Sequence, residues 1–304
     1  MQSKFEKFNK LPPELKTETA QNLSIRDLVN LARTSKKHLA LFKPVIDVCK
    51  LLHHVTRGEH DVVNAMLKQD ISLILKRGIV TDCSGREFES ISGFEYALWA
   101  LDKHMWAKMI ACVPQNEEGK RIFELLIDQY NKVNTDGVTY RLNGKTITEK
   151  HFDFENTIIK ELQTQVDSIN ALGVNSGVID KQWREGVGGA QKLLPMHIVD
   201  EYCSNEPFYP VPEFTSQPKS SKQFYNWTTT NKDEDWFSVG SEFAIYKGRV
   251  SGARGCAEAP LGVGCADLDA MTALCKVRTL DLINLKSQLE GRAGLENHYQ
   301  VAPM

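Results

Sequence analysis

The residues best placed to do chemistry are His197, Asp200 and Cys203, which lie close together in the carboxy-terminal half of the chain. A cysteine acts as a nucleophile only as a thiolate, and a base within hydrogen-bond reach must hold it in that form. The stretch around these residues is predicted to be helical, and residues 197 and 203 are too far apart on one helix to face each other. We therefore interpret Cys203 as a structural cysteine and predict no catalytic residues.

A second candidate is the glycine-rich segment GRVSGARGCAEAPLGVG at residues 248–264. A phosphate-binding loop would need G-x-x-x-x-G-K-[ST], or G-x-G-x-x-G after a strand, and the segment has neither order. We interpret it as an ordinary loop. Arg249 and Arg254, with Glu242 nearby, could still attract an acidic or nucleotide ligand. They support the alternative hypothesis of a nucleotide-dependent transferase in the carboxy-terminal half.

The cysteines and histidines of the chain do not form a recognisable metal motif. The seven cysteines are scattered and odd in number, unlike the dense, even set of a disulfide framework, so a reducing cytosol fits them best. No two cysteines have C-x-x-C spacing, and no histidine pair stands at i, i+4 beside a glutamate. We predict no metal site and no cofactor.

Charge and hydropathy argue against two further classes of function. The formal net charge is -2 and the pI is near 6.5, with basic and acidic residues interspersed, so no positive field attracts nucleic acid. There is no run of about 18 apolar residues that could cross a bilayer. The start, Met1 to Lys10, lacks the apolar region of a signal peptide. We expect no nucleic-acid partner, no membrane span and no standard secretory signal.

Short amphipathic helices are predicted between residues 11 and 41. A proline pair opens the segment, where a helix tolerates a missing N–H, and Ser24 followed by Asp27 is a loose capping box for a second helix. Helices this short are marginal alone and need a partner surface. That surface is either the domain that follows, which the helices would cap, or another protein.

The same segment resembles the F-box family in its residues and their spacing over about a tenth of the chain. The matching residues are Leu11-Pro12, Glu14-Leu15, Leu23, Asp27-Leu28, Leu31 and Ser35-Lys36. Thr19 and Ala20 depart from the larger aliphatic pair that the family favours, and His38-Leu39 replaces its tryptophan region. The resemblance implies binding to Skp1, the adaptor of cullin-RING ubiquitin ligases. The implied anchors are Leu11, Pro12, Leu15, Leu23, Leu28 and Leu31.

The next segment resembles ankyrin repeats. Leu51, Gly58 and Val62-Val63 match one repeat, and a second copy begins at Phe94, with an enlarged loop expected between the two. Three aromatic residues of the second copy could form a target-binding surface, although aromatic residues at helical spacing more often form a core. They are Tyr96, Trp99 and Trp106.

The remainder of the chain predicts a mixture of helices and strands. Asn143-Gly144 between alternating residues is a strong hairpin signal, and helices are expected over residues 117–132, 154–172 and from Asp267 onward. Prolines over residues 204–222 exclude regular structure there. The predicted fold is mainly α, with α+β in the carboxy-terminal half. The predicted domains are an F-box (1–48), ankyrin-like repeats (49–132) and an α+β target-binding region (133–304).

The phrase GGAQKLLPMHIVDEYCS in this half resembles carboxy-terminal regions of effectors that Legionella-type intracellular bacteria deliver into host cells. This resemblance implies a protein that works in the host cytoplasm, where Skp1 is present, after secretion without a standard signal peptide. We therefore predict a receptor that is not itself an enzyme and that recruits an unknown host target protein to an SCF-type ubiquitin ligase. The alternative is an effector enzyme that its F-box localises.

Overall fold

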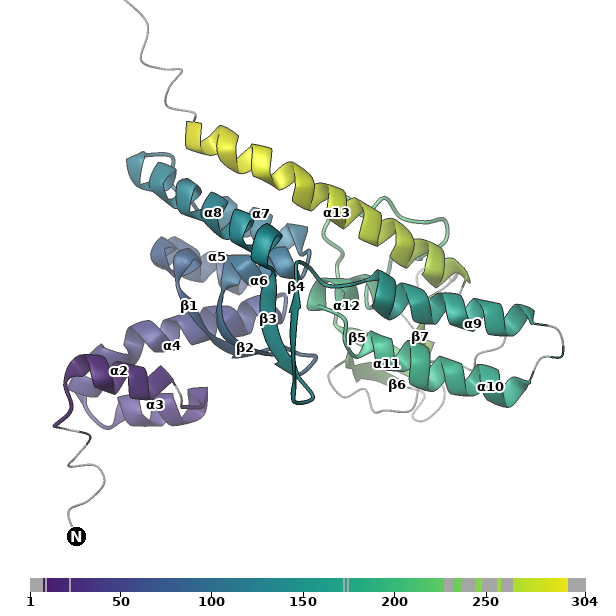
Figure 1. The fold of residues 1–304 in the computed structure, drawn as a ribbon, viewed down its shortest axis with the longest axis horizontal. Coiled ribbons are helices and arrows are strands. Elements are labelled where there is room, and N and C mark those ends of the chain that lie inside the picture. Colours follow the sequence, from purple (N-terminus) through teal and green to yellow (C-terminus); the bar gives the residue numbers. More distant parts are fainter. Residues whose placement is uncertain are drawn as a thin grey trace, which may run out of the picture.

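The computed structural model describes residues 8, 10–21, 23–171, 173, 175–226, 232–236, 244–247, 256–257 and 265–294. The fold is mainly α-helical with two small β-sheets, which confirms the predicted fold class (Figure 1). Three helices begin the described chain, one long helix ends it, and the sheets lie between them. In the part of the chain that the structure describes, no helix has the length and apolar character needed to cross a bilayer.

The first three helices form a small unit, here called the amino-terminal module. They are α2 (Pro13–Gln21), α3 (Ile25–Arg33) and the first half of α4 (Lys36–Thr56). The Ser24 hydroxyl accepts a hydrogen bond from the Asp27 N–H at 3.1 Å, so Ser24 caps α3 as its spacing predicted. Ser35 caps α4 in the same way. The module has a core of its own, separate from the main core of the molecule, made of Ala20, Leu28, Ala32, Phe42 and Ile46.

Helix α4 leaves the module and enters the main body without a break (Figure 1). Its first half packs on α3, and its second half contributes Leu51, Leu52 and Val55 to the main core. The predicted boundary between residues 48 and 49 therefore falls inside one helix. The expected boundary at residue 132 likewise falls inside α8 (Glu117–Asp136).

The segment between the two helix pairs that were predicted to resemble ankyrin repeats contains a β-hairpin, so the prediction of an enlarged loop there was wrong. The first pair is α4 and α5 (His60–Gln69), and the second is α6 (Gly93–Trp99) and α7 (Lys103–Ile110). Between them lie a 3₁₀ turn (Ile71–Leu75) and strands β1 (Arg77–Thr81) and β2 (Glu87–Ser92). Gly78 of β1 lies so close to α4 that a Cβ atom there would be 2.9 Å from Val48 Cγ1.

The predicted Asn143-Gly144 hairpin is present as β3 (Val138–Leu142) and β4 (Lys145–Glu149). Both turn residues have positive φ, 51° and 76°, which suits the twist of a two-residue hairpin. Strands β1 to β4 form one antiparallel sheet in sequence order. The residue types of the turn were sufficient to place this hairpin.

The carboxy-terminal half begins with helices that include two π-helical stretches, Glu155–Ile159 and Gln182–Val187. The α-helices of this part are α9 (Lys160–Asn170), α10 (Ser176–Lys181), α11 (Gly188–Gln191) and α12 (Met196–Tyr202). A Cβ atom at Gly186 would lie 2.6 Å from Glu161 Oε2, so this glycine permits close packing of the two helical stretches. Of the helix predicted over residues 154–172, the structure confirms residues 155–170 as helical.

A second sheet and the last helix complete the described chain. The sheet has the strand order β6-β5-β8-β7, with β5 (Gln223–Asn226), β6 (Lys232–Asp235), β7 (Ile245–Tyr246) and β8 (Cys256–Ala257). Helix α13 (Cys265–Gly294) packs on α7, α8 and α9, so it joins the two halves of the main body along one side (Figure 1). Its buried Leu274, Leu285 and Leu289 belong to the main core.

Candidate functional site

The predicted Skp1 anchors lie on the amino-terminal module, and most of them are accessible. Leu15 and Leu23 are 46% and 37% exposed, and Pro12 is exposed as well. Leu11 and Leu31 are half-buried. Exposed leucines close together on a small helical unit are the kind of surface that a protein partner can cover.

The prediction that Leu28 is an anchor was wrong, because its side chain is only 1% exposed. It packs against Ala20, Ala32 and Phe42 inside the core of the module. Leu28 lies one helical turn after the N-cap residue Ser24, and its side chain points into the core of the module, which it stabilises. It cannot contact a partner in this conformation.

An apolar groove of about 410 Å³ opens beside the exposed leucines. Two of the predicted anchors, Leu23 and Leu31, line it. Thr19, which departs from the F-box pattern, also lines the groove, and its hydroxyl donates to the Leu15 carbonyl at 2.7 Å. The remaining lining residues are Phe8, Asp27, Asn30 and Thr34.

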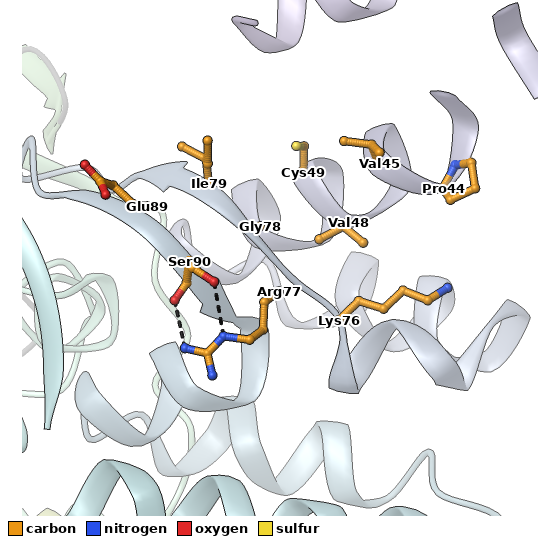
Figure 2. A pocket seen from close by; sticks show the side chains of 10 residues that line it. All are labelled: Pro44, Val45, Val48, Cys49, Lys76, Arg77, Gly78, Ile79, Glu89 and Ser90. Atoms are coloured by element: carbon orange, nitrogen blue, oxygen red, sulfur yellow. Dashed lines mark hydrogen bonds between the residues drawn. The ribbon is translucent and has the colours of Figure 1, made fainter. Parts of the chain in front are cut away.

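A larger groove of about 650 Å³ runs between α4 and the β1–β2 hairpin (Figure 2). Pro44, Val45 and Val48 of α4 give it an apolar wall, and Arg77 stands on the strand side. Arg77 is held there by hydrogen bonds to the Ser90 hydroxyl at 3.3 Å and carbonyl at 2.8 Å. Burial raises the pKa of the Cys49 thiol in this groove, so thiolate chemistry is disfavoured there.

The three aromatic residues predicted to bind a target lie in the core, so this prediction was wrong. Trp99 is fully buried, and Tyr96 and Trp106 are each 3% exposed. Trp99 instead stacks near the buried Arg86, whose guanidinium carbon is 5.1 Å from the centre of the Trp99 ring. Tyr140 and Phe152 complete this aromatic cage around Arg86. The cage replaces solvent around a buried cation, which is a structural role.

His197, Asp200 and Cys203 come from α12 and its C-cap, yet each side chain has different surroundings. His197 Nε2 donates to the Ala100 carbonyl at 2.6 Å, and burial lowers the pKa of His197 to about 4, so its ring is neutral. Cys203 is buried in the main core. Asp200 alone lines a pocket. The three side chains therefore do not act as one group.

A buried polar network surrounds α12, and sequence reasoning did not find it. Arg278 of α13 is fully buried, and its guanidinium lies 3.6 Å from Glu201 Oε1 and donates to His104 Nε2 at 3.1 Å. Burial raises the pKa of Glu201 to about 7, although Arg278 acts in the opposite direction. Burial lowers the pKa of His104 to about 4, and the Arg278 charge adds to that effect.

His60 of α5 also faces a buried carboxylate, Asp102, with 3.7 Å between Nε2 and Oδ1. Burial alone would lower the pKa of His60, but the nearby Asp102 carboxylate outweighs burial and raises it. Among these network residues, His60 and Asp200 both line a small polar pocket. The residues of the whole network come from α5, α7, α12 and α13, so no local spacing in the sequence could have grouped them.

The predicted transferase residues Arg249, Arg254 and Glu242 lie outside the described residues, as does most of the glycine-rich segment. Within the described ranges, no group of three or more His, Cys, Asp or Glu side chains is placed to hold a metal ion. Among the described cysteines, none of these six forms a disulfide bond: Cys49, Cys83, Cys112, Cys203, Cys265 and Cys275.

Comparison with known proteins gives two matches. Residues 157–289 match the family model of the CBUA0006 C-terminal domain. The chain is 36% identical over 262 residues to CBUA0006 of Coxiella burnetii (strain RSA 493 / Nine Mile phase I), an uncharacterized protein, and the alignment covers 79% of this chain and 74% of the relative. No solved structure matches. The matched domain includes Asp200 and Arg278, whereas His60 and the amino-terminal module precede it.

Proposed function

We infer that this chain, which belongs to the family of the Coxiella burnetii protein CBUA0006, is an adaptor that binds Skp1 through its amino-terminal module. In this role it recruits a host target protein to a cullin-RING ubiquitin ligase in the host cytoplasm. The chain itself then needs no catalytic residue, because bringing the target beside the ligase raises its effective concentration.

One observation carries this proposal: the leucines that match the F-box pattern border an apolar groove on a module with its own core. Leu23 and Leu31 line the groove, and Leu15 is exposed on the same module. A monomer gains nothing from leaving large aliphatic side chains in water, and a partner that covers the exposed part of such a leucine contributes about 1 kcal/mol. Covering Leu15 and Leu23 would therefore supply a substantial part of the affinity for Skp1.

The connection between the module and the main body suits a receptor. Helix α4 is continuous from Lys36 to Thr56 and packs on both α3 and β1. A partner held on the module is thereby kept at a defined distance and orientation from the rest of the chain. An adaptor that must present a bound target to a ligase requires such a rigid link.

The test is binding of purified Skp1 to the full chain, measured by calorimetry. The double variant Leu15→Ala and Leu23→Ala should bind roughly thirtyfold more weakly, because two leucine contacts of about 1 kcal/mol each are lost. The matched control replaces two equally exposed leucines outside the module, Leu125→Ala and Leu280→Ala, which are 47% and 56% exposed, and it should bind like the unchanged chain.

The proposal is wrong if the unchanged chain does not bind Skp1, or if the two double variants bind it equally well. A ubiquitination assay with the complete ligase separates the adaptor from the alternative, an effector enzyme that its F-box localises. The adaptor modifies its target only when all ligase components are present, whereas the enzyme modifies it without them.

A further inference from the structure

Strand β1 forms one edge of the first sheet, whose strand order is β1-β2-β3-β4, and among the described strands it pairs only with β2. In an antiparallel pair, alternate N–H and C=O groups of each strand point away from the partner strand. In the part of the chain that the structure describes, no residue outside β2 makes a hydrogen bond to the main chain of residues 77–81. The outer side of β1 therefore presents main-chain donors and acceptors that another strand can use.

The middle of β1 lacks the residues that usually protect an edge strand. Native edge strands often carry a lysine, another charged residue or a proline, which prevents pairing with a second chain. The middle of β1 is instead Gly78, Ile79 and Val80. Ile79 is 41% exposed, although isoleucine stabilises a strand mainly by packing against its neighbours. These features are typical of an edge that a partner covers.

The groove of about 650 Å³ lies beside this strand, with residues 76–79 on one side and α4 on the other (Figure 2). Gly78 lets the two elements approach closely, because a Cβ atom there would lie 2.9 Å from Val48 Cγ1 and 3.1 Å from Leu52 Cδ1. Val48 and Leu52 belong to the main core, so the two sides of the groove are fixed before a ligand arrives.

The two cations of the groove already have acidic partners. Arg77 pairs with the buried Glu95, and Lys76 Nζ lies 3.6 Å from Asp70 Oδ2. The groove therefore does not select an acidic ligand. Its apolar side on α4 and the main chain of β1 are the features that a ligand can use, and an extended, largely apolar peptide is complementary to both.

We propose that an extended segment of a partner protein binds in this groove as an additional strand. Its main chain pairs with the outer side of β1, and alternate aliphatic side chains contact Pro44, Val45 and Val48 of α4. In this mode of recognition the main-chain hydrogen bonds supply affinity and the contacts of alternate side chains supply specificity. Since β1 has 5 residues, or about 17 Å of strand, a segment of about five residues pairs with it.

The volume of the groove favours a peptide over a second copy of this chain. A second copy would bring its own β1 together with the α4 that packs on it, and a groove of about 650 Å³ does not hold both elements. A single extended segment has no such attached helix, so it can lie between α4 and β1.

In the adaptor proposed above, the segment belongs to the target protein, and this identification rests on the proposed function. Val45 lines the groove and also packs against the core of the amino-terminal module. A target held in the groove is therefore next to the module that binds Skp1. The strand addition itself does not depend on Skp1.

The probe is a fluorescent, capped peptide in which valine and threonine alternate over seven residues, with one further lysine at each end for solubility. Two matched peptides carry N-methyl groups, one on its valines and the other on its threonines. The N–H groups of alternate residues lie on opposite edges of a strand, so each methylated peptide keeps only one edge that can pair.

Binding to the full chain is measured by fluorescence anisotropy. We expect one methylated peptide to bind within about threefold of the unmethylated peptide, and the other to bind at least about tenfold more weakly, because it loses two or three main-chain hydrogen bonds. The unmethylated peptide should also slow hydrogen exchange of the amides of residues 77–81.

A charged residue at the edge tests the place of binding. Ile79→Lys should weaken binding of the unmethylated peptide about tenfold or more, because the lysine would lose water when the added strand covers it. The matched control Leu125→Lys makes a similar change at a 47% exposed position on α8 and should bind like the unchanged chain. Thermal unfolding of both variants shows that they are folded.

Three outcomes would overturn the proposal: no binding of the unmethylated peptide at millimolar concentration, equal binding of the two methylated peptides, or unchanged binding to Ile79→Lys. Equal binding of the methylated peptides would mean that side chains alone make the contact. None of these measurements includes Skp1. A chain that binds Skp1 but not the peptide keeps the adaptor function and loses this site, and a chain that binds the peptide but not Skp1 shows the reverse.

Discussion

Asp200 should make the stability of this protein depend on pH in a direction that its surroundings determine. Burial raises the pKa of Asp200 from 3.8 to about 6, and the Asp102 charge acts the same way, while Lys222 and a hydrogen bond from Ser220 act against it. A raised carboxyl pKa means that the folded chain holds the proton more tightly than the unfolded chain. The stabilisation from protonation is therefore complete below about pH 4 and is lost as the pH rises through about 6.

A shift of this size corresponds to about 3 kcal/mol, which is the cost that ionised Asp200 imposes on the folded chain at neutral pH. Asp200→Asn cannot ionise and escapes this cost. Its free energy of unfolding should equal that of the unchanged chain at about pH 4 and exceed it by up to about 3 kcal/mol at pH 7. Urea unfolding, followed by tryptophan fluorescence over this pH range, measures the free energy of unfolding of both proteins.

The difference between the two proteins is the decisive quantity, because Glu201 also has a raised pKa and contributes the same background to both. Asp128→Asn on the surface of α8 serves as the control and should track the unchanged chain at every pH. If the stability difference between Asp200→Asn and the unchanged chain does not vary with pH, then Asp200 has an ordinary pKa, and the conclusion that burial raises it is wrong.

Two further predictions concern the cores. Arg86→Met removes the cation that pairs with buried Asp82 at 3.4 Å, and it should lower the free energy of unfolding by about 3 to 5 kcal/mol; adding Asp82→Asn should restore part of the loss, and the absence of any rescue would show that the pair is not the cause. Leu28→Ala should destabilise the amino-terminal module by about 2 to 5 kcal/mol, seen as faster hydrogen exchange of α2 and α3, whereas exposed Leu23→Ala should change that exchange little. Equal exchange in the two leucine variants would contradict the assignment of Leu28 to the core.

Local residue types in the sequence were sufficient to predict several parts of this protein. Ser24 caps its helix, and Asn143-Gly144 makes a two-residue hairpin, because the conformations needed at these positions depend on neighbouring residues alone. The mainly α fold with a mixed second half follows from hydrophobic periodicity for the same reason. The F-box resemblance named Leu15 and Leu23 as partner-binding residues, and both are exposed in the folded chain.

The tertiary structure alone decided which apolar and polar side chains share one environment. Leu28 looks like its neighbour Leu31 in sequence, yet the packing of α3 on α4 buries only Leu28 completely. Trp99 became a core residue because the folded sheet brings Arg86, Tyr140 and Phe152 around it. His60, Asp102 and Asp200 meet only after three distant helices pack together. Hydrophobic periodicity records which face of a helix is buried but not what it is buried against, so such clusters appear only when the chain folds.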